Sequence, residues 1–257
     1  LGLQLAPNNM FRRDRLASTF TGAVDGLKES TTDIELAGRV ISARAAYEKD
    51  GVFLPLPYRA IDPDILPMFD VEILKGSAAA FEDKLEVALL SEKEAAHLFG
   101  DADPIGKTID INGTHTVAIV GVFKNLPANT HLMVDPEARS AFDFLVPISL
   151  FEKIDDNTIK NGWNSIDSMV ASYVVAREGV SEEQLTASLT AHLMANSDEQ
   201  DKANFTGMFP QSIKKIQTGS MEQDGIDLVL VIRLVGGLIL GLAVLNAISL
   251  ASARMIN

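Results

Sequence analysis

Alternating hydrophobic and polar positions predict a β-hairpin in the first quarter of the chain. The runs Glu35–Tyr47 and Val52–Ile61 have the residue pattern of strands, and Asp50-Gly51 lies between them. Glycine adopts a positive φ at little cost, which a tight hairpin turn requires. We therefore expect these two runs to be neighbouring strands.

A second hairpin is predicted further along the chain. The runs Thr108–Ile111 and Thr114–Phe123 are joined by Asn112-Gly113, the strongest hairpin signal in the sequence. The other predicted strands are short or isolated, and they are Val71–Leu74, Glu86–Leu90, Met169–Arg177 and Ile213–Gln217.

One helix is predicted from apolar spacing and another from a proline. Apolar residues fall close to one helical face between Asn9 and Leu27, which indicates an amphipathic helix. Asp62 before Pro63 is typical of an N-cap followed by the first helical residue, and this short helix should run to about Phe69.

Two further helices are predicted from capping boxes, in which a serine and a residue three positions later bind each other's backbone N–H groups. Ser91 with Glu94 opens Glu92–Phe99, which Gly100 ends, and Ser181 with Gln184 opens Glu182–Met194. Asn125–Arg139 has the composition of a loop and Asn196–Asn204 that of a polar linker. Strands and helices mix without a regular βαβ alternation, so the pattern predicts an α+β fold of mixed or antiparallel sheets in two lobes.

A long apolar run near the end of the chain, Leu228–Leu250, predicts a transmembrane helix. About 23 residues at about 1.5 Å each reach about 35 Å, which is enough to cross a bilayer core. Arg233 lies near its start and Arg254 just past its far end, which favours an extracytoplasmic location for residues 1–225.

The alternative for this run is a buried helix of a soluble protein. Leu234–Leu245 has no polar face, which favours the membrane. Gly237 and Gly241 form a G-x-x-x-G pair that would permit close helix packing.

We expect the chain to be an internal part of a longer polypeptide, because it starts at Leu1 and stops just after the apolar run. The predicted division is an extracytoplasmic domain at 1–225, a transmembrane helix at 226–252 and the start of a cytoplasmic segment at 253–257.

Charge and composition exclude several classes of function. The formal net charge is −13, which argues against a nucleic-acid partner because phosphate neutralisation needs a basic surface. The chain contains no cysteine, which removes disulfides, thiolate metal sites and thiol catalysis. The plain interpretation of the acidity is solubility.

Residues that could carry chemistry are few and scattered. Gly100–Thr108 is close to a phosphate-binding P-loop, but five residues separate its glycines instead of four, and it follows a helix and opens a strand. The carboxylates Asp62, Asp64 and Asp70 are best explained by a cap and solvated loops, and Trp163 by a half-buried anchor. The four histidines, His97, His115, His131 and His192, form no i, i+4 pair. We predict no catalytic, cofactor-binding or metal-ligating residue.

Between Leu89 and Leu132 a capped helix ending in Phe-Gly is followed by Asp-Pro-x-Gly-Lys, a hairpin, Val-x-Gly-Val and Leu-Pro-x-Asn. This region resembles the MacB-like periplasmic core domain of FtsX-type ABC transporter permeases. Asp62–Gly76 and Phe142–Leu150 extend the resemblance, whereas Met133–Ala141 departs from it as a short insertion. The motif residues allow tight turns and carry no reactive group, and they are Phe99, Gly100, Asp103, Pro104, Gly106, Lys107, Asn112, Gly113 and Gly121.

The resemblance implies the architecture and partners of a permease. Residues of roughly 80–135 would form an inserted lobe, and the flanks would form the other. A separate cytoplasmic ATPase would supply energy, a second permease protomer would complete a dimer, and the outer domain would engage cargo or a periplasmic partner at the bacterial cytoplasmic membrane. The predicted function is non-catalytic coupling of ATP-driven helix motion to cargo or envelope partners. The alternative is the extracytoplasmic ligand-sensing domain of a membrane signalling receptor.

Overall fold

The computed structural model describes residues 1–7, 15–16, 18–49, 51–83, 86–127, 141–154, 162–164, 166, 170–213 and 233–244. The chain forms two compact units, Leu1–Pro210 and Gln211–Asn257. In the second unit the described helix covers residues 233–244, and no helix of the described ranges is long and apolar enough to cross a membrane. The other residues of the predicted span, 226–232 and 245–252, lie outside the described ranges.

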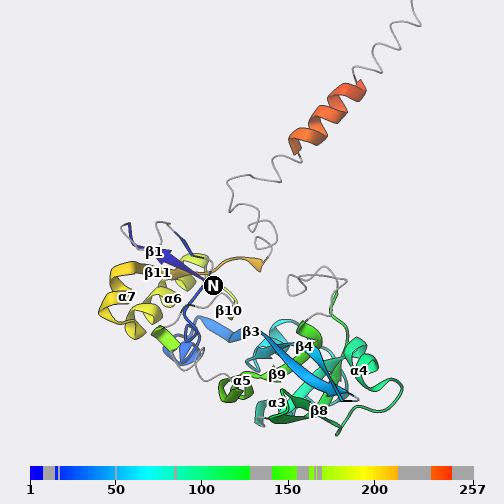
Figure 1. Ribbon diagram of the computed structural model, residues 1–257. Coiled ribbons are helices and arrows are strands. Elements are labelled where there is room, and N and C mark those ends of the chain that lie inside the picture. The colour runs from blue at the N-terminus through cyan, green and yellow to red at the C-terminus, as the bar shows by residue number, and fades with distance from the viewer. Residues whose placement is uncertain are drawn as a thin grey trace, which may run out of the picture. The chain divides into compact units, whose positions relative to one another are not determined.

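The first unit is built on a large mixed sheet (Figure 1). Its strands in spatial order are β10 (Val170–Ala176), β3 (Ile34–Lys49), β4 (Val52–Ile61), β9 (Phe144–Pro147), β6 (Val87–Ser91), β8 (His115–Phe123) and β5 (Ile73–Gly76), and β7 (Thr108–Ile111) pairs with β8 and touches β3. The pairs β4–β9 and β6–β8 are parallel, and the other pairs are antiparallel.

Both faces of the large sheet are buried, which explains the apolar run of its central strand β6. Successive side chains of a strand point to opposite faces. Ala88 and Leu90 accordingly pack in one cluster, whereas Val87 and Leu89 pack in another that includes Phe123. The helices of this part are α2 (Ile65–Met68), α3 (Ala79–Asp83), α4 (Glu92–Phe99), α5 (Ile148–Ile154) and the 3₁₀ turn η1 (Ala141–Asp143).

A second, smaller sheet shares no strand pairing with the large one and packs on a separate hydrophobic cluster. It consists of β11 (Phe205–Phe209), β1 (Gly2–Leu5) and β2 (Arg15–Leu16), and it is accompanied by α1 (Leu27–Ser30), α6 (Glu182–Asn196) and α7 (Glu199–Asn204). The first and last strands of the unit are direct neighbours, with Gly2 opposite Phe209. We call these elements the small-sheet part, together with residues 18–26, whose Phe20 and Val24 pack in the same core, and we call the large sheet with its helices the large-sheet part.

Strand β3 belongs to the cores of both parts. Ile34 and Ala37 pack in the small-sheet cluster with Leu3 and Leu189, whereas Ile41 further along the strand packs in a large-sheet cluster. In Figure 1, β3 runs from beside β10 to beside β4.

The two predicted hairpins and the two predicted serine N-caps are confirmed. Asn112 and Gly113 have φ angles of 56° and 68°, as the tightest hairpin turn requires. Asn112 also fixes this turn to β3, because its side-chain oxygen accepts from the Ala46 N–H at 2.9 Å and its own N–H donates to the Ala46 carbonyl at 2.8 Å. Ser91 caps α4, and Ser181 forms the complete predicted capping box of α6.

Three predictions along the chain are wrong or lie outside the described residues. Within Asn9–Leu27 the described residues form β2, an isolated bridge at Phe20 and turns, because Phe20 and Val24 bury their side chains in the small-sheet core without a helix. The predicted polar linker contains α7, which Asp198 caps, and it is followed by β11. The predicted strand Ile213–Gln217 lies outside the described residues except at Ile213, which is helical.

The capping box of α6 yields a stability prediction. Ser181→Ala should lower the free energy of unfolding by about 1 kcal/mol, because the first turn loses its side-chain acceptor. Ser181→Asp should keep most of the wild-type value, since aspartate is an equally good N-cap. Urea denaturation of both variants checks this, and an equal loss in both would show that the cap is not the cause.

Candidate functional site

Strand β3 pairs with β10 on one edge and with β4 on the other, and two carboxylates bind the β4 edge near Arg39, where β4 does not reach. Its pairing with β10 ends at Ile41, and its pairing with β4 begins only at Val40. Directly after β4, Asp62 accepts from the Arg39 backbone N–H at 2.8 Å, and Asp64 accepts from the Ala37 N–H at 3.2 Å. The two carboxylates therefore continue the hydrogen bonding of β3 past the end of β4.

This arrangement corrects the predicted role of Asp62 as the N-cap of a helix. The N-cap position of α2 is Asp64, and its side chain makes no capping hydrogen bond. Asp62 forms an ion pair with Arg39, because a buried guanidinium binds a carboxylate more strongly than a backbone N–H group does. Asp70, the third predicted loop carboxylate, has a positive φ of 50°.

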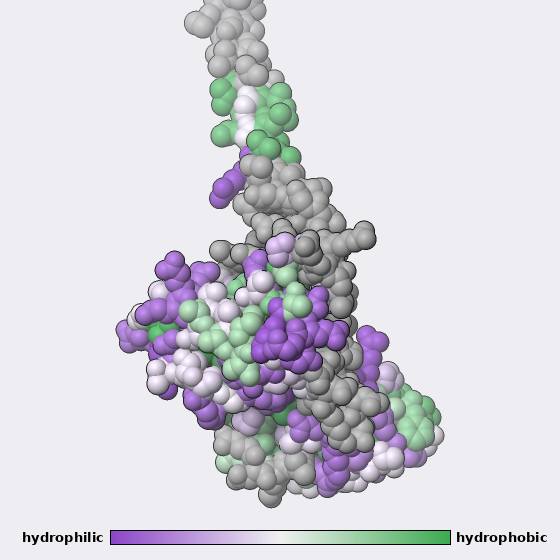
Figure 2. Space-filling view, turned by 90° about the vertical axis from the view of Figure 1, so that its left-hand side faces the viewer, coloured by the Kyte–Doolittle hydropathy of each residue, from purple (hydrophilic) through white to green (hydrophobic). Residues whose placement is uncertain are grey.

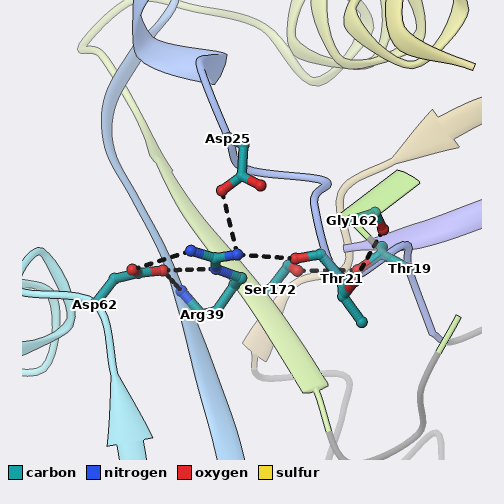
Figure 3. Close-up of polar contacts among 7 residues, drawn as sticks. All are labelled: Thr19, Thr21, Asp25, Arg39, Asp62, Gly162 and Ser172. Carbon is teal, nitrogen blue, oxygen red and sulfur yellow. Dashed lines mark hydrogen bonds and ion pairs between the residues drawn. The ribbon is translucent and has the colours of Figure 1, made fainter. Parts of the chain in front are cut away.

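The Arg39 side chain lies at the centre of a buried polar junction (Figure 3). Only 6% of the residue is exposed. Its Nε donates to Asp62 Oδ2 at 2.9 Å and its Nη2 to Asp62 Oδ1 at 3.3 Å. Its Nη1 donates to the Thr21 carbonyl at 3.1 Å and lies 3.1 Å from Asp25 Oδ1. We call these four residues the Arg39 junction.

The segment that carries Thr21 and Asp25 also makes hydrogen-bonding contacts with β10 and with a short turn at Gly162. The hydroxyl oxygens of Thr19 and of Ser172 on β10 lie 2.9 Å apart. Thr21 Oγ1 donates to the Gly162 carbonyl at 2.8 Å, in the 3₁₀ turn η2 (Gly162–Asn164). The contacts in Figure 3 thus join residues 19–25, β3, β10, η2 and Asp62 directly after β4.

Charges in the junction shift one another's pKa values. Burial acts to lower the pKa of Arg39, but the hydrogen bonds and charge of Asp62 raise it above its usual value. Burial raises the pKa of Asp25, and the Arg39 charge opposes this. Burial likewise raises the pKa of Glu152 on α5, and the positive charge of Arg39 acts to lower it. The cluster therefore holds one cation near two carboxylates, Asp25 and Glu152, that are costly to charge.

His192 on α6 extends this region into the small-sheet core. It is 5% exposed, and its ring centroid lies 5.3 Å from that of Trp163, which packs in turn 5.7 Å from Phe20. Trp163 is partly buried against this cluster, so the prediction of a half-buried anchor is confirmed. Burial lowers the pKa of His192 below its usual 6.5, although the backbone and carboxylate of Asp25 act in the opposite direction.

The lowered pKa of His192 predicts acid sensitivity. Below pH 6.5 His192 is protonated in the unfolded chain, whereas in the folded chain it becomes protonated only at a lower pH. The free energy of unfolding therefore falls as the pH falls through that window. Asp25 and Glu152, with raised pKa values, act with the opposite sign at lower pH. Urea midpoints at pH 7.5 and 5.5 should differ less for His192→Gln than for wild type. An unchanged difference would exclude His192 as the source.

The motif residues from Gly100 to Lys107 form the loop between α4 and β7, whereas Asn112 and Gly113 form the turn between β7 and β8 and Gly121 lies in β8. Gly100 ends α4 with φ 59°, and the Lys107 ammonium lies 5.0 Å from the centre of the Phe99 ring. Asp103 accepts from the Ile105 N–H at 3.2 Å, and the Lys107 N–H donates to the Pro104 carbonyl at 3.0 Å.

The glycines of this motif allow close backbone packing. The Gly106 N–H donates to the Ile119 carbonyl at 2.8 Å, and a Cβ on Gly121 would lie 2.8 Å from a Leu89 methyl group. A helix precedes this loop and a strand follows it, so it lacks the helix N-terminus that a P-loop offers to phosphate. None of these residues belongs to the Arg39 junction.

Gly237 and Gly241 lie in the helix of residues 233–244, and a Cβ built on either would have no atom within 4 Å. Side chains around them are exposed, including Leu238 at 67% and Leu240 at 68%. The visible face of this helix is mostly hydrophobic (Figure 2).

Sequence reasoning missed the Arg39 junction, although a signal for it was present. Arg39 interrupts the apolar side of a predicted strand, and a charged residue there needs a partner. Asp62 directly follows the neighbouring strand of the same predicted hairpin, which made it the nearest candidate. The contributions of Thr21 and Asp25 were not predictable, because a helix was expected over that segment.

One family model matches most of the first unit, and similar solved structures share its fold. The model of the MacB-like periplasmic core domain matches residues 4–192. A search of curated proteins finds no match.

Three similar solved structures come from bacterial membrane proteins. A domain assigned to a permease protein of Porphyromonas gingivalis has 21% identity and a TM-score of 0.60, covering 82% of this chain and 89% of its own. The periplasmic region of MacB from Actinobacillus actinomycetemcomitans has 16% identity and a TM-score of 0.55, covering 86% and 91%. The extracellular domain of the noncanonic ABC-type transporter YknZ from Gram-positive bacteria has 16% identity and a TM-score of 0.51, covering 80% and 96%. At these identities the likeness shows a shared fold.

Proposed function

The chain belongs to the family of MacB-like periplasmic core domains, periplasmic parts of ABC transporter permeases, and from this premise we propose that it couples ATP-driven membrane motion to cargo or partner handling. Domains of this family are transporter components and not enzymes of a known class. Family membership also favours the permease over the ligand-sensing receptor.

The observation that supports this proposal is that β3 contributes residues to the cores of both parts. Motion arriving at either end of the first unit would reach β1 and β11 together, because these strands pair along their length. β11 packs on α6, whose leucines share a core with the first residues of β3. β3 then continues into the large-sheet core without interruption. A displacement of the small-sheet part would therefore act on the large-sheet part through β3, which would bend between the two cores, so that the two parts would move relative to each other as lobes.

The source of motion in this proposal is a membrane helix at residues 226–252. The helix of residues 233–244 supports it, because its exposed apolar side chains would be stable in lipid. Residues 1–225 would lie outside the cytoplasm, and a cytoplasmic ATPase would act on the membrane segments from the other side.

A second protomer is proposed to pack on the glycine face of that helix. Replacing Gly237 and Gly241 with isoleucine in the complete transporter should weaken dimerisation, because the added side chains would keep two helices apart. Unchanged dimerisation would remove the proposed role of this face. In this proposal the inserted lobe of residues roughly 80–135 lies within the large-sheet part, and the motif glycines have a structural role.

The coupling is tested by a distance measurement in the complete transporter. The chain contains no cysteine, so Val52→Cys in the large-sheet part and Gln200→Cys in the small-sheet part provide unique spin-label sites within it. Labelled protomers are diluted with unlabelled ones, so that distances within one chain dominate. Pulsed electron paramagnetic resonance should give different distance distributions in the nucleotide-free and ATP-bound states.

A control pair separates coupling from local change. Val52→Cys with Lys75→Cys places both labels on exposed residues of the large sheet, and their distance should not respond to ATP. The same distribution for the 52–200 pair in both states, in a transporter that hydrolyses ATP, would overturn the proposed coupling.

A further inference from the structure

The contacts around Arg39 fall into two unequal groups. One group lies within the large-sheet part and joins Arg39 to Asp62. The other joins β3 and the start of α2 to residues 21–28 of the small-sheet part. The two groups differ in number of bonds and in exposure.

The Asp62 group is the stronger one. The Asp62 carboxylate accepts from both Nε and Nη2 of Arg39 and from its backbone N–H, and the Asp62 N–H donates to the Arg39 carbonyl at 3.1 Å. The Asp62 side chain is 18% exposed, so water competes weakly for these bonds. A two-pronged, sheltered arginine–carboxylate pair is among the strongest polar contacts in proteins.

The group toward residues 21–28 is weaker. Asp25 meets Arg39 at a single distance of 3.1 Å, and half of its side chain, 50%, is exposed. Thr21 contributes one carbonyl acceptor. Lys28 pairs with Asp64 nearby, with side chains 43% and 22% exposed. Exposed ion pairs of this kind are each worth little, because water and salt screen them.

Opening the weaker group would not leave Arg39 without a counter-charge. Asp62 would keep its hydrogen bonds with Arg39, and the carboxylate of Glu152 on α5 also attracts the guanidinium. Opening it would also separate Asp25 from Asp62, whose negative charge makes Asp25 harder to ionise. The open arrangement thus carries no isolated buried charge, which is the usual obstacle to breaking such a cluster.

We propose that the Arg39 junction is a one-sided latch: Arg39 and Asp62 stay joined, while the contacts of Asp25 with Arg39 and of Lys28 with Asp64 hold the small-sheet part in one arrangement and release it in the working cycle. This latch rests on the proposed coupling and adds the place at which contacts between the two parts open while β3 still joins them. It also explains why Asp62-Pro63-Asp64 makes two kinds of contact, hydrogen bonds to β3 and an ion pair with Lys28.

The latch is tested in the nucleotide-free complete transporter with the spin-label pair at positions 52 and 200. Wild type should give one narrow distance distribution. Asp25→Ala should broaden it or add a second population, and the double variant Asp25→Ala/Lys28→Ala should do so further. Asp25→Glu keeps a carboxylate near Arg39 and should restore most of the narrow distribution.

A matched control is Glu35→Ala, which removes an exposed carboxylate from the same strand β3 outside the junction and should leave the distribution unchanged. Melting temperatures of all variants should stay close to wild type, since the altered contacts are half exposed. A narrow, wild-type distribution for both Asp25→Ala and the double variant would overturn the latch. Failure of the coupling itself appears separately, as a wild-type distribution that does not respond to ATP.

Discussion

Replacing Arg39 with methionine should lower the free energy of unfolding by about 3–5 kcal/mol, because removal of one partner of a buried charge cluster leaves the others unpaired. Asp62 would lose both side-chain hydrogen bonds from Arg39 while remaining mostly buried. Methionine fills a similar volume, so the loss would not come from an empty cavity. Urea denaturation of the 257-residue chain, followed by the fluorescence of its single tryptophan, measures the change.

Arg44→Met is the matched control for this variant. Arg44 lies on the same strand and is exposed, so its replacement should change the free energy of unfolding by less than about 0.5 kcal/mol. A loss below about 1 kcal/mol for Arg39→Met would mean that the junction contributes little to stability.

Replacing Gly76 with alanine should destabilise the chain by about 3 kcal/mol or more. Gly76 ends β5 with φ 71°, and an added Cβ would lie 2.1 Å from the Val120 carbonyl oxygen of the paired strand β8. The positive φ alone costs about 1–2 kcal/mol for a residue with a Cβ. The remainder arises because backbone atoms must separate, which weakens the pairing of β5 with β8.

Gly113→Ala isolates the contribution of φ from that of crowding. Gly113 has φ 68°, but an added Cβ there would meet no atom within 4 Å. Its replacement should therefore cost only about 1–2 kcal/mol. Thermal or urea unfolding of the two variants checks the difference. Equal losses would mean that β5 shifts freely and that close strand packing at Gly76 is unimportant.

The elements that are specified by residues close in sequence were predicted correctly. The Asn112-Gly113 turn and the Ser91 and Ser181 caps depend on neighbours within four residues, so each could be read directly. The strand pair Glu35–Tyr47 and Val52–Ile61 was predictable for the same reason and forms β3 and β4.

Elements that depend on distant contacts were not predictable. The apolar spacing of residues 9–27 imitates a helix, but Phe20 and Val24 are buried by packing against residues of α6 and β11 that are far away in sequence. β11 was missed because its register is set by β1, at the opposite end of the unit. The role of Asp62 was misassigned because an aspartate before proline has a strong local interpretation, whereas its partner Arg39 lies 23 residues away.

Amide hydrogen exchange in the complete transporter, with and without a non-hydrolysable ATP analogue, tests most directly whether motion crosses this unit at the Arg39 junction. The account predicts that residues 19–28 lose protection when the analogue binds. The amides of β6 and β8 inside the large sheet should keep their protection, because those strands move as one body. Identical exchange of residues 19–28 in both states, in a preparation that hydrolyses ATP, would contradict the account.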